Sequence, residues 1–239
     1  MPSPLDRYRS MKDFGRIYST EGAYHQQATG FKAWFLADNY RAIAAEARPE
    51  DEVLDLGCGE GCLGELLKVR RLVGVDNSEA ALALNRELYP DVYHQLVRGD
   101  LRALGELPLE RPGYDLVACS LTLMYVAASD LPGCLAEVRR FLRPGGRFVF
   151  SYPTVSQYRA ANPTADELPA DQVRWQLQQA GFCEVSMQPL APLLPPNLVR
   201  QSQSPQKGEE AHRAYQRARK SMSLENCYHW LGLARTETP

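Results

Sequence analysis

Short apolar runs alternate with amphipathic segments over most of this chain. Five runs have the length and apolar character of buried strands, at 52–56, 72–76, 92–97, 114–119 and 147–152. Helical spacing and capping residues predict helices at 60–68, 79–88, 131–142 and 170–180. Two more strands are expected at 182–189 and 228–234. Such alternation is typical of an α/β fold, in which helices cover both faces of a mainly parallel sheet.

Two segments lie outside this alternation. Residues 1–50 include an expected helix at 31–47 and form a predicted N-terminal helical cap, whereas residues 51–239 form the main domain. An insertion at 190–224 begins with prolines, continues with a glutamine- and serine-rich stretch, and ends in an expected helix at 209–222. Ligands of open α/β sheets bind outside the carboxyl ends of the strands. We therefore expect the cap and the insertion to supply any lid over that edge.

A loop with glycine at every second position follows the first predicted strand. It holds Gly57, Gly59 and Gly61, and Asp55 lies two residues before the first of them. Glycines permit tight turns and close approach of the backbone to a ligand, and the helix expected next would present unpaired N–H groups. A dinucleotide fingerprint needs a third glycine where this chain has Cys62, and no P-loop lysine follows. The acid favours a ligand that carries positive charge.

A second acid, Asp76, ends the second predicted strand. It follows Gly57 by 19 residues, close to the spacing of about 20 at which an acid accepts the hydroxyls of a ribose. Ser78 is then expected to cap the helix at 79–88. These positions predict a site for a nucleoside-containing ligand at the carboxyl edge of the sheet.

The order of these features resembles the class I S-adenosylmethionine (SAM) methyltransferases. The pattern Asp-x-Gly-x-Gly-x-Gly is similar to their motif I, and residues 135–150 resemble the small-molecule branch that includes the ubiquinone and menaquinone methyltransferases. The resemblance covers about residues 50–190. It implies a Rossmann-like sheet of seven strands in the order 3-2-1-4-5-7-6, with the last strand antiparallel. It also implies SAM as methyl donor, S-adenosylhomocysteine as product and a small-molecule methyl acceptor.

At the amino-acid end of the cofactor, the resemblance assigns four residues. Gly57 and Gly59 allow close approach of the backbone. Asp55 orients the ammonium group through a water or a loop N–H, and Ser120 lies where the chain passes that group.

At the adenosine end, the resemblance gives Asp76 to the ribose and places Asn77 beside the adenine. Asp100 and Leu101 would contact the edge of the adenine ring. The alternative for Asp100, as for Ser120, is a turn residue with no ligand.

The catalytic and acceptor-binding residues are less marked. Relatives often carry a histidine where this chain has Met124, so His25 becomes the first candidate general base. Tyr24, Tyr125 and Tyr152 lie in segments expected to face an apolar pocket. The alternative for each of these residues is ordinary packing, and His94 and His229 are expected to be structural.

Composition limits the partners. With 239 residues, 44% hydrophobic and a net charge of −2, the chain suits one α/β domain with no global attraction to nucleic acid or to anionic membranes. The longest nearly apolar run, 116–128, is too short to span a bilayer. No signal peptide is evident, and the six cysteines lack metal-ligand spacing. We expect reduced cysteines, no metal and a cytoplasmic location.

Two alternatives to a small-molecule methyltransferase stay open. Five cations against two acids between positions 207 and 220 would suit an RNA methyltransferase, although such a run is more often a solvated helix face. The missing motif histidine would suit a SAM-binding protein without turnover. Cys62 at the third glycine position argues against a nicotinamide-dependent oxidoreductase.

Overall fold

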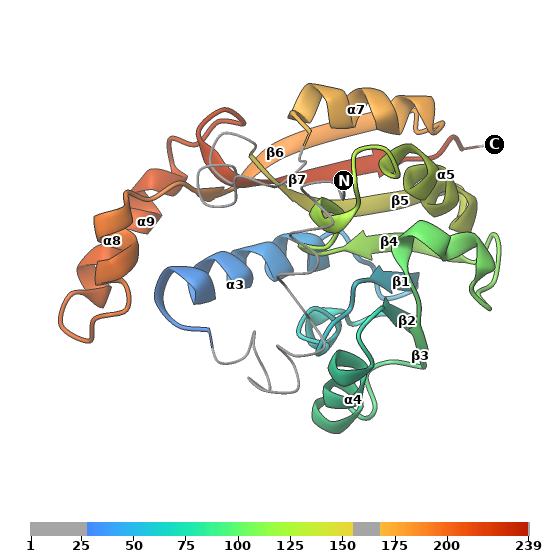
Figure 1. The fold of residues 1–239 in the computed structure, drawn as a ribbon, viewed down its shortest axis with the longest axis horizontal. Helices are drawn as coiled ribbons and strands as arrows, with labels where there is room; N and C mark the ends of the chain where they lie inside the picture. Colours follow the sequence, from blue (N-terminus) through green and yellow to red (C-terminus); the bar gives the residue numbers. More distant parts are fainter. Residues whose placement is uncertain (1–27, 155–167, 239) are drawn as a thin grey trace, which may run out of the picture.

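The computed structural model describes residues 28–154 and 168–238 (Figure 1). Seven strands form one sheet in the order β3-β2-β1-β4-β5-β7-β6. The strands are β1 (Glu52–Leu56), β2 (Arg71–Asp76), β3 (Gln95–Arg98), β4 (Tyr114–Cys119), β5 (Leu142–Pro153), β6 (Glu184–Pro192) and β7 (Cys227–Arg235). The first five strands pair in parallel, and β7 is antiparallel to both β5 and β6. The predicted strand order and antiparallel last strand are confirmed.

Helices cover both faces of the sheet. On one face α3 (Gly30–Ala44) packs Phe35 and Ile43 against strand residues such as Val53. On the other face α5 (Leu131–Phe141) and α7 (Ala170–Gln179) contribute Val138 and Val173 to a second apolar cluster. The helix α4 (Glu79–Leu88) follows β2. No helix within the described ranges is long and apolar enough to cross a membrane.

The helix predicted at 60–68 is wrong. Gly64–Leu66 forms only a 3-10 turn, because Gly61 has a φ of +92° and Leu67 is already extended. A Cβ at Gly64 would lie 2.4 Å from the hydroxyl oxygen of Tyr93. Glycine is a poor helix former, so the segment turns directly back toward β2. No long helix therefore offers its N-terminus behind the glycine loop.

Other predicted elements differ only at their ends. The helices predicted at 31–47 and 209–222 correspond to α3 and to α9 (Gly208–Arg219). The strand predicted at 92–97 begins three residues later, at Gln95; its neighbour His94 accepts a hydrogen bond from the N–H of Leu72 through Nδ1 (3.3 Å). The strand predicted at 147–152 begins at Leu142, which pairs with Tyr114 across an irregular register.

The insertion lies on the carboxyl side of the sheet. Because β6 and β5 are both antiparallel to β7, β6 runs parallel to β5, and residues 193–226 leave from its carboxyl end. The insertion carries α8 (Pro196–Gln201) and α9, which extend beyond the sheet at the left of Figure 1. It contacts α3, where the Tyr215 hydroxyl donates to Asp38 (2.6 Å) and the Phe31 N–H donates to the Ser202 hydroxyl (2.9 Å).

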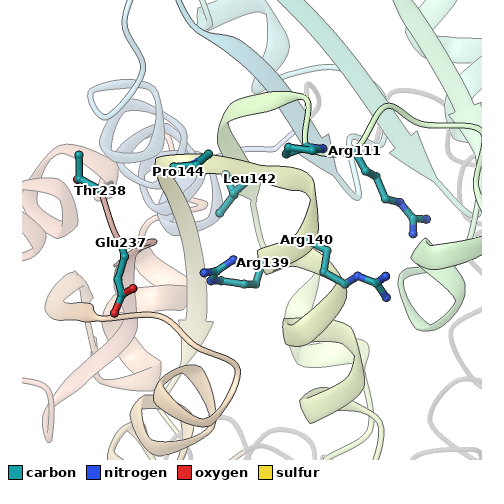
Figure 2. Close-up of a pocket in the computed structure, with 8 residues that line it drawn as sticks. Arg111, Arg139, Arg140, Leu142, Pro144, Glu237 and Thr238 are labelled. Atoms are coloured by element: carbon teal, nitrogen blue, oxygen red, sulfur yellow. The ribbon is translucent and has the colours of Figure 1, made fainter.

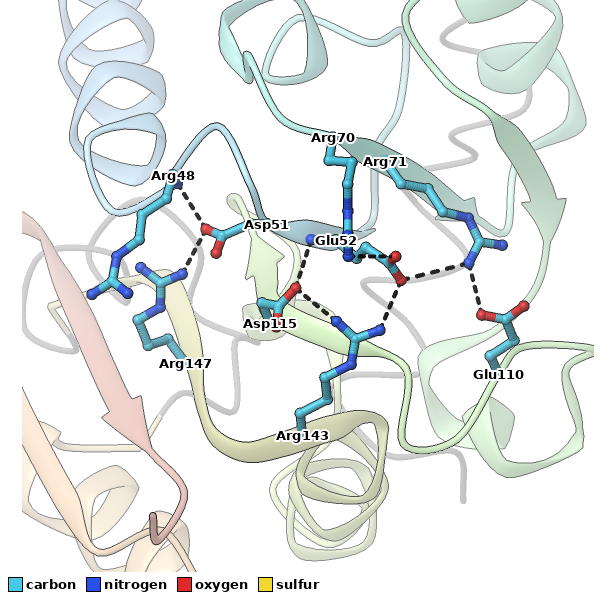
Figure 3. Close-up of polar contacts among 9 residues, drawn as sticks. All are labelled: Arg48, Asp51, Glu52, Arg70, Arg71, Glu110, Asp115, Arg143 and Arg147. Atoms are coloured by element: carbon cyan, nitrogen blue, oxygen red, sulfur yellow. Dashed lines mark hydrogen bonds and ion pairs between the residues drawn. The ribbon is translucent and has the colours of Figure 1, made fainter. Parts of the chain in front are cut away.

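Ion pairs gather at the opposite, amino edge of the sheet (Figure 3). Arg143 joins Asp115 of β4 (2.8 Å) to Glu52 of β1 (2.9 Å). Arg147 of β5 pairs with Asp51 (2.5 Å) and also donates to the Glu46 carbonyl (2.6 Å). The Arg147–Asp51 pair is buried, so each charge depends on its partner for compensation.

Removing one member of that buried pair should destabilise the fold. We expect Arg147→Met to lower the free energy of unfolding by about 3 kcal/mol, because the buried Asp51 carboxylate loses its counter-charge. The matched control, Arg213→Met, breaks an exposed pair with Glu209 and should cost less than about 0.5 kcal/mol. Urea unfolding measures both variants. Equal losses would contradict the importance given to the buried pair.

Candidate functional site

The strand order predicts a ligand-binding crevice between the carboxyl ends of β1 and β4. From β1 the chain proceeds outward to β2 and β3, then returns to the other side of β1 as β4. Such a reversal is where open α/β sheets bind their ligands. The glycine loop at 57–61 follows β1, and the turn at 120–122 follows β4. These two segments form the facing walls.

The glycine loop and the turn after β4 are in close contact. Gly57 has a φ of +73°, and a Cβ built on it would lie 2.1 Å from Oγ1 of Thr122. Gly59 also has a positive φ, +51°. The N–H groups of Gly57 and Cys58 both donate to the Val75 carbonyl at the end of β2 (2.7 and 3.0 Å). The glycines are therefore required by the fold itself, as well as by any ligand.

Asp76 organises the loop and the start of α4 together. One carboxylate oxygen accepts from the Gly59 N–H and the other from the Ser78 N–H, both at 2.9 Å. Burial raises the pKa of Asp76, while hydrogen bonds from backbone N–H groups act to lower it. The expected cap is present, because the Ser78 hydroxyl accepts from the Ala81 N–H (3.3 Å). Sequence reasoning gave Asp76 to a ribose and missed this structural role.

Asp55 is completely buried behind the loop. One of its oxygens accepts from the Tyr93 hydroxyl (2.7 Å), and the other has no hydrogen-bond partner among the described residues. Burial raises the pKa of Asp55 to about 7, although the Tyr93 hydrogen bond lowers it. Tyr93 was missed from the sequence. Its only signal was indirect, because Gly64 and Gly74 leave room for its ring.

The residues predicted for the adenosine end meet at one edge. Asp76 pairs in register with Arg98, and the Gly99 N–H donates to the Asp76 carbonyl (3.0 Å). Asp100 caps the turn Leu101–Glu106 by accepting from the Arg102 N–H (2.9 Å) and forms an ion pair with the Arg102 side chain. Leu101 is buried, whereas Asn77, just after β2, is exposed.

The turn after β4 is strained and is held by three hydrogen bonds. Leu121 has a φ of +54°, and its N–H donates to the Ser151 hydroxyl (3.0 Å). The Thr122 hydroxyl donates to the Ser120 carbonyl (2.9 Å). The Ser120 hydroxyl accepts from Nδ2 of Asn39 on α3 (2.6 Å). Such strain persists only where the surroundings impose it and often marks a binding site. No sequence motif pointed to Asn39.

The residues predicted to bind the acceptor or to act in catalysis lie in different environments, and two of them lie outside the described residues. His25 and Tyr24 lie outside the described residues. Tyr125 ends the turn Leu123–Tyr125 and is partly buried. Tyr152 is buried against Trp230, with ring centroids 5.4 Å apart, and its hydroxyl accepts from the Leu168 N–H (3.2 Å). This environment favours the packing alternative for Tyr152.

His229 packs beside the Phe35 ring at 4.6 Å, and burial lowers its pKa to about 3. Its neutral ring belongs to the core, in line with the structural role expected for it. All six cysteines are free. Within the described part of the chain, no group of three or more His, Cys, Asp or Glu side chains could hold a metal ion.

A surface hollow of about 560 Å³ lies at the other end of the sheet (Figure 2). It is lined by Arg111, Pro112, Arg139, Arg140, Leu142, Pro144, Glu237 and Thr238. Its arginines serve the fold: Arg111 donates to the Leu104 carbonyl (3.0 Å), Arg139 to the Gly181 carbonyl (3.0 Å) and Arg140 to Glu137 (3.0 Å). None of the predicted site residues lines it.

Comparison with known proteins finds one family model and several relatives that each match part of the chain. A family model described as a methyltransferase domain matches residues 54–150. The chain is 34% identical over 126 residues to carboxy-S-adenosyl-L-methionine synthase of Pseudomonas paraeruginosa, covering 48% of this chain and 50% of that protein. It is 29% identical over 159 residues to demethylmenaquinone methyltransferase of Symbiobacterium thermophilum, covering 62% and 61%. The chain thus spans between half and two thirds of the length of these relatives.

A solved structure shows the same fold. The SAM-dependent methyltransferase from Thermotoga maritima, described as a possible histamine N-methyltransferase, superposes with a TM-score of 0.63 at 16% identity. The match covers 94% of this chain and 98% of that one. The segment matched by the family model contains the glycine loop, Asp76 and the turn after β4. Residues 54–150 are therefore similar to a methyltransferase domain.

Proposed function

We propose that the protein transfers a methyl group from SAM to an oxygen or nitrogen atom of a small-molecule metabolite. The crevice between β1 and β4 carries this proposal. It lies within the segment that matches the methyltransferase family model, and Gly57 and Gly59, both with positive φ, bring the backbone of one wall to its surface without a side chain of their own. The similarity to a demethylmenaquinone methyltransferase supports a small-molecule acceptor.

The chemistry of the crevice fits SAM. Its ammonium group would lie toward the buried Asp55, whose carboxylate has an oxygen without a partner in the described chain. Gly57 and Gly59 would allow the amino-acid end to approach the backbone. The cofactor has no phosphate, and the loop has neither the third fingerprint glycine nor a P-loop lysine.

The adenosine end would be held by residues after β2 and β3. Asp76 lies at the crevice with both oxygens oriented by backbone N–H groups. Each carboxylate oxygen has a further lone pair, which the ribose hydroxyls would use. Asn77, Asp100 and Leu101 follow the same edge and would surround the adenine.

SAM supplies an activated methyl group on a sulfonium sulfur, so the protein has mainly to orient two reactants in a dry site. Orientation of this kind contributes roughly 7–11 kcal/mol to lowering a barrier. The insertion and α3 lie on the carboxyl side of the sheet and would exclude water there. We propose His25 as the general base and Tyr24 and Tyr125 as acceptor contacts.

The insertion gives little support to an RNA substrate. Two of its five cations between 207 and 220 are paired within the chain, Arg213 with Glu209 (2.5 Å) and Arg219 with Asp38 (3.3 Å). Phosphate contacts require cations that can turn toward the nucleic acid. The Arg219–Asp38 pair joins α9 to α3 and gives this one cation of the strip a structural role.

Replacing Asp76 tests the ribose assignment. We expect Asp76→Ala to weaken SAM binding at least about tenfold, since charge-assisted hydrogen bonds to the ribose are lost and Gly59 loses its anchor. Isothermal titration calorimetry measures the affinity, and circular dichroism checks the fold. An unchanged affinity in a folded variant would refute the assignment.

The pKa of Asp55 predicts a pH-dependent affinity. At pH 5.5 the carboxyl is mostly protonated and uncharged; as pH rises toward 7 it gains the charge that attracts the ammonium group. We expect SAM affinity to rise on the order of tenfold between pH 5.5 and 7.0, below the usual range of an α-amino group, about 7.7–8.0. Asp55→Asn should flatten this dependence. An equally steep profile in that variant would contradict the role of Asp55.

The acceptor class is tested directly with methyl-labelled SAM, the purified protein and an extract of its source cells. We expect label in the metabolite fraction. Label in RNA would establish the nucleic-acid alternative. Saturable SAM binding without labelling of any fraction would favour a binding protein without turnover.

A further inference from the structure

Asn39 connects α3 to the crevice. Its side chain is completely buried, and Nδ2 donates to the Ser120 hydroxyl oxygen at 2.6 Å. Asn39 lies outside residues 54–150, the segment that the family model matches. Ser120 is itself 8% exposed and stands at the end of β4, on the wall of the crevice. The contact therefore joins the N-terminal helix to a residue at the binding edge.

The amide of Asn39 has a defined direction. Its Oδ1 has no hydrogen-bond partner among the described residues. If the Asn39 amide were rotated by 180°, Nδ2 and its two N–H donors would occupy the position that has no partner. Unpaired donors are rarer in proteins than under-used oxygens. The observed direction is therefore the one with the fewer unpaired donors.

The direction of this hydrogen bond determines what Ser120 can offer. A hydroxyl has one proton and two lone pairs. Because Asn39 occupies a lone pair of Ser120 Oγ, the hydroxyl proton does not point at Asn39 and stays available. The Ser120 carbonyl is engaged separately by the Thr122 hydroxyl (2.9 Å). Ser120 thus keeps a proton that it can donate toward the carboxyl edge of the sheet.

Contacts of the two neighbouring residues on α3 hold Asn39 in place. The adjacent Asp38 accepts from the Tyr215 hydroxyl (2.6 Å) and pairs with Arg219 (3.3 Å), both on α9. The neighbouring Tyr40 is buried in the core. These contacts restrict rotation of the helix, so Asn39 is fixed before any ligand arrives.

We propose that Asn39 is a positioning residue that makes Ser120 a donor to the carboxylate of the cofactor's amino-acid end, in place of the position beside the ammonium group that the sequence resemblance implied. The inference rests on the proposed function, because it assumes that SAM occupies the crevice. Asp55 pairs with Ala118 of β4, two residues before Ser120, so Asp55 and Ser120 face the same side of the sheet. The zwitterionic end of the cofactor then meets an acidic group at Asp55 and a hydroxyl donor at Ser120.

The test compares two ligands that differ only at the carboxylate. SAM carries the carboxylate, whereas decarboxylated SAM keeps the ammonium and sulfonium groups without it. The variant Asn39→Asp replaces the amide donor with an acceptor and so turns the Ser120 proton away from the crevice. The variant Asn39→Leu has a similar size and removes both polar atoms. Calorimetry measures both affinities for each protein, with thermal unfolding as the check on folding.

We expect Asn39→Asp to bind SAM at least about tenfold more weakly and decarboxylated SAM within about twofold of the wild type. Asn39→Leu should show a smaller loss of SAM affinity, since the Ser120 hydroxyl is then free to rotate and its proton is not turned away from the crevice. In a Ser120→Ala background, Asn39→Asp should change the affinities for SAM and for decarboxylated SAM by the same factor. A loss confined to SAM in that background would mean that the new carboxylate repels the ligand directly, and it would overturn the inference.

Equal losses for both ligands in Asn39→Asp would overturn the inference and leave Asn39 a packing residue. Unchanged SAM affinity in either folded variant would overturn it as well. In both cases the wild-type protein would still bind SAM, and the proposed function would stand. If the wild-type protein bound neither ligand, the proposed function would be refuted, and the inference with it.

Discussion

The contact between Gly57 and Thr122 is the constraint on which the candidate site depends. The loop after β1 and the turn after β4 approach so closely that a single added carbon at Gly57 would meet the threonine side chain at 2.1 Å. Each wall has its own anchors: the Val75 carbonyl and Asp76 fix the loop, and the Ser151 hydroxyl fixes the turn. These contacts therefore fix the position of the loop relative to the turn.

Several residues at this edge serve the fold and the ligand at once. Asp76 holds the loop through Gly59 while keeping lone pairs toward the crevice. Burial disfavours the charged form of Asp55 and so raises its pKa. Buried polar groups that the protein itself does not satisfy are expected where a ligand or water completes them. The same carboxylates that organise the loop would thus complement a cationic cofactor.

Local patterns in the sequence predicted the fold well. Alternating strands and helices, the cap at Ser78 and the glycine loop depend on neighbouring residues, and the resemblance to known methyltransferases supplied the place of the antiparallel β7. The helix at 60–68 failed because Gly61 and Gly64 adopt a turn that periodicity does not reveal.

Long-range contacts were the part that the sequence could not provide. Tyr93 meets Asp55 from 38 positions away, and Asn39 meets Ser120 from 81 positions away. Nothing in the local sequence of either residue marks it as part of the site. Tyr152 was expected near a pocket from its place near the end of β5, yet its side chain is buried and its hydroxyl accepts from the Leu168 N–H. The cofactor role of each site residue stays a prediction.

Hydrogen–deuterium exchange of the protein with and without SAM locates the cofactor site without assuming which residues bind it. If SAM binds at the carboxyl ends of β1 and β4, exchange should be slower at 57–61, at 76–78, at 99–101 and at 120–122 when SAM is present. Amides around the hollow at Arg139 and Leu142 should exchange at the same rate in both states. Protection at that hollow alone, or no protection at the ends of β1 and β4, would show that SAM does not bind at this edge of the sheet.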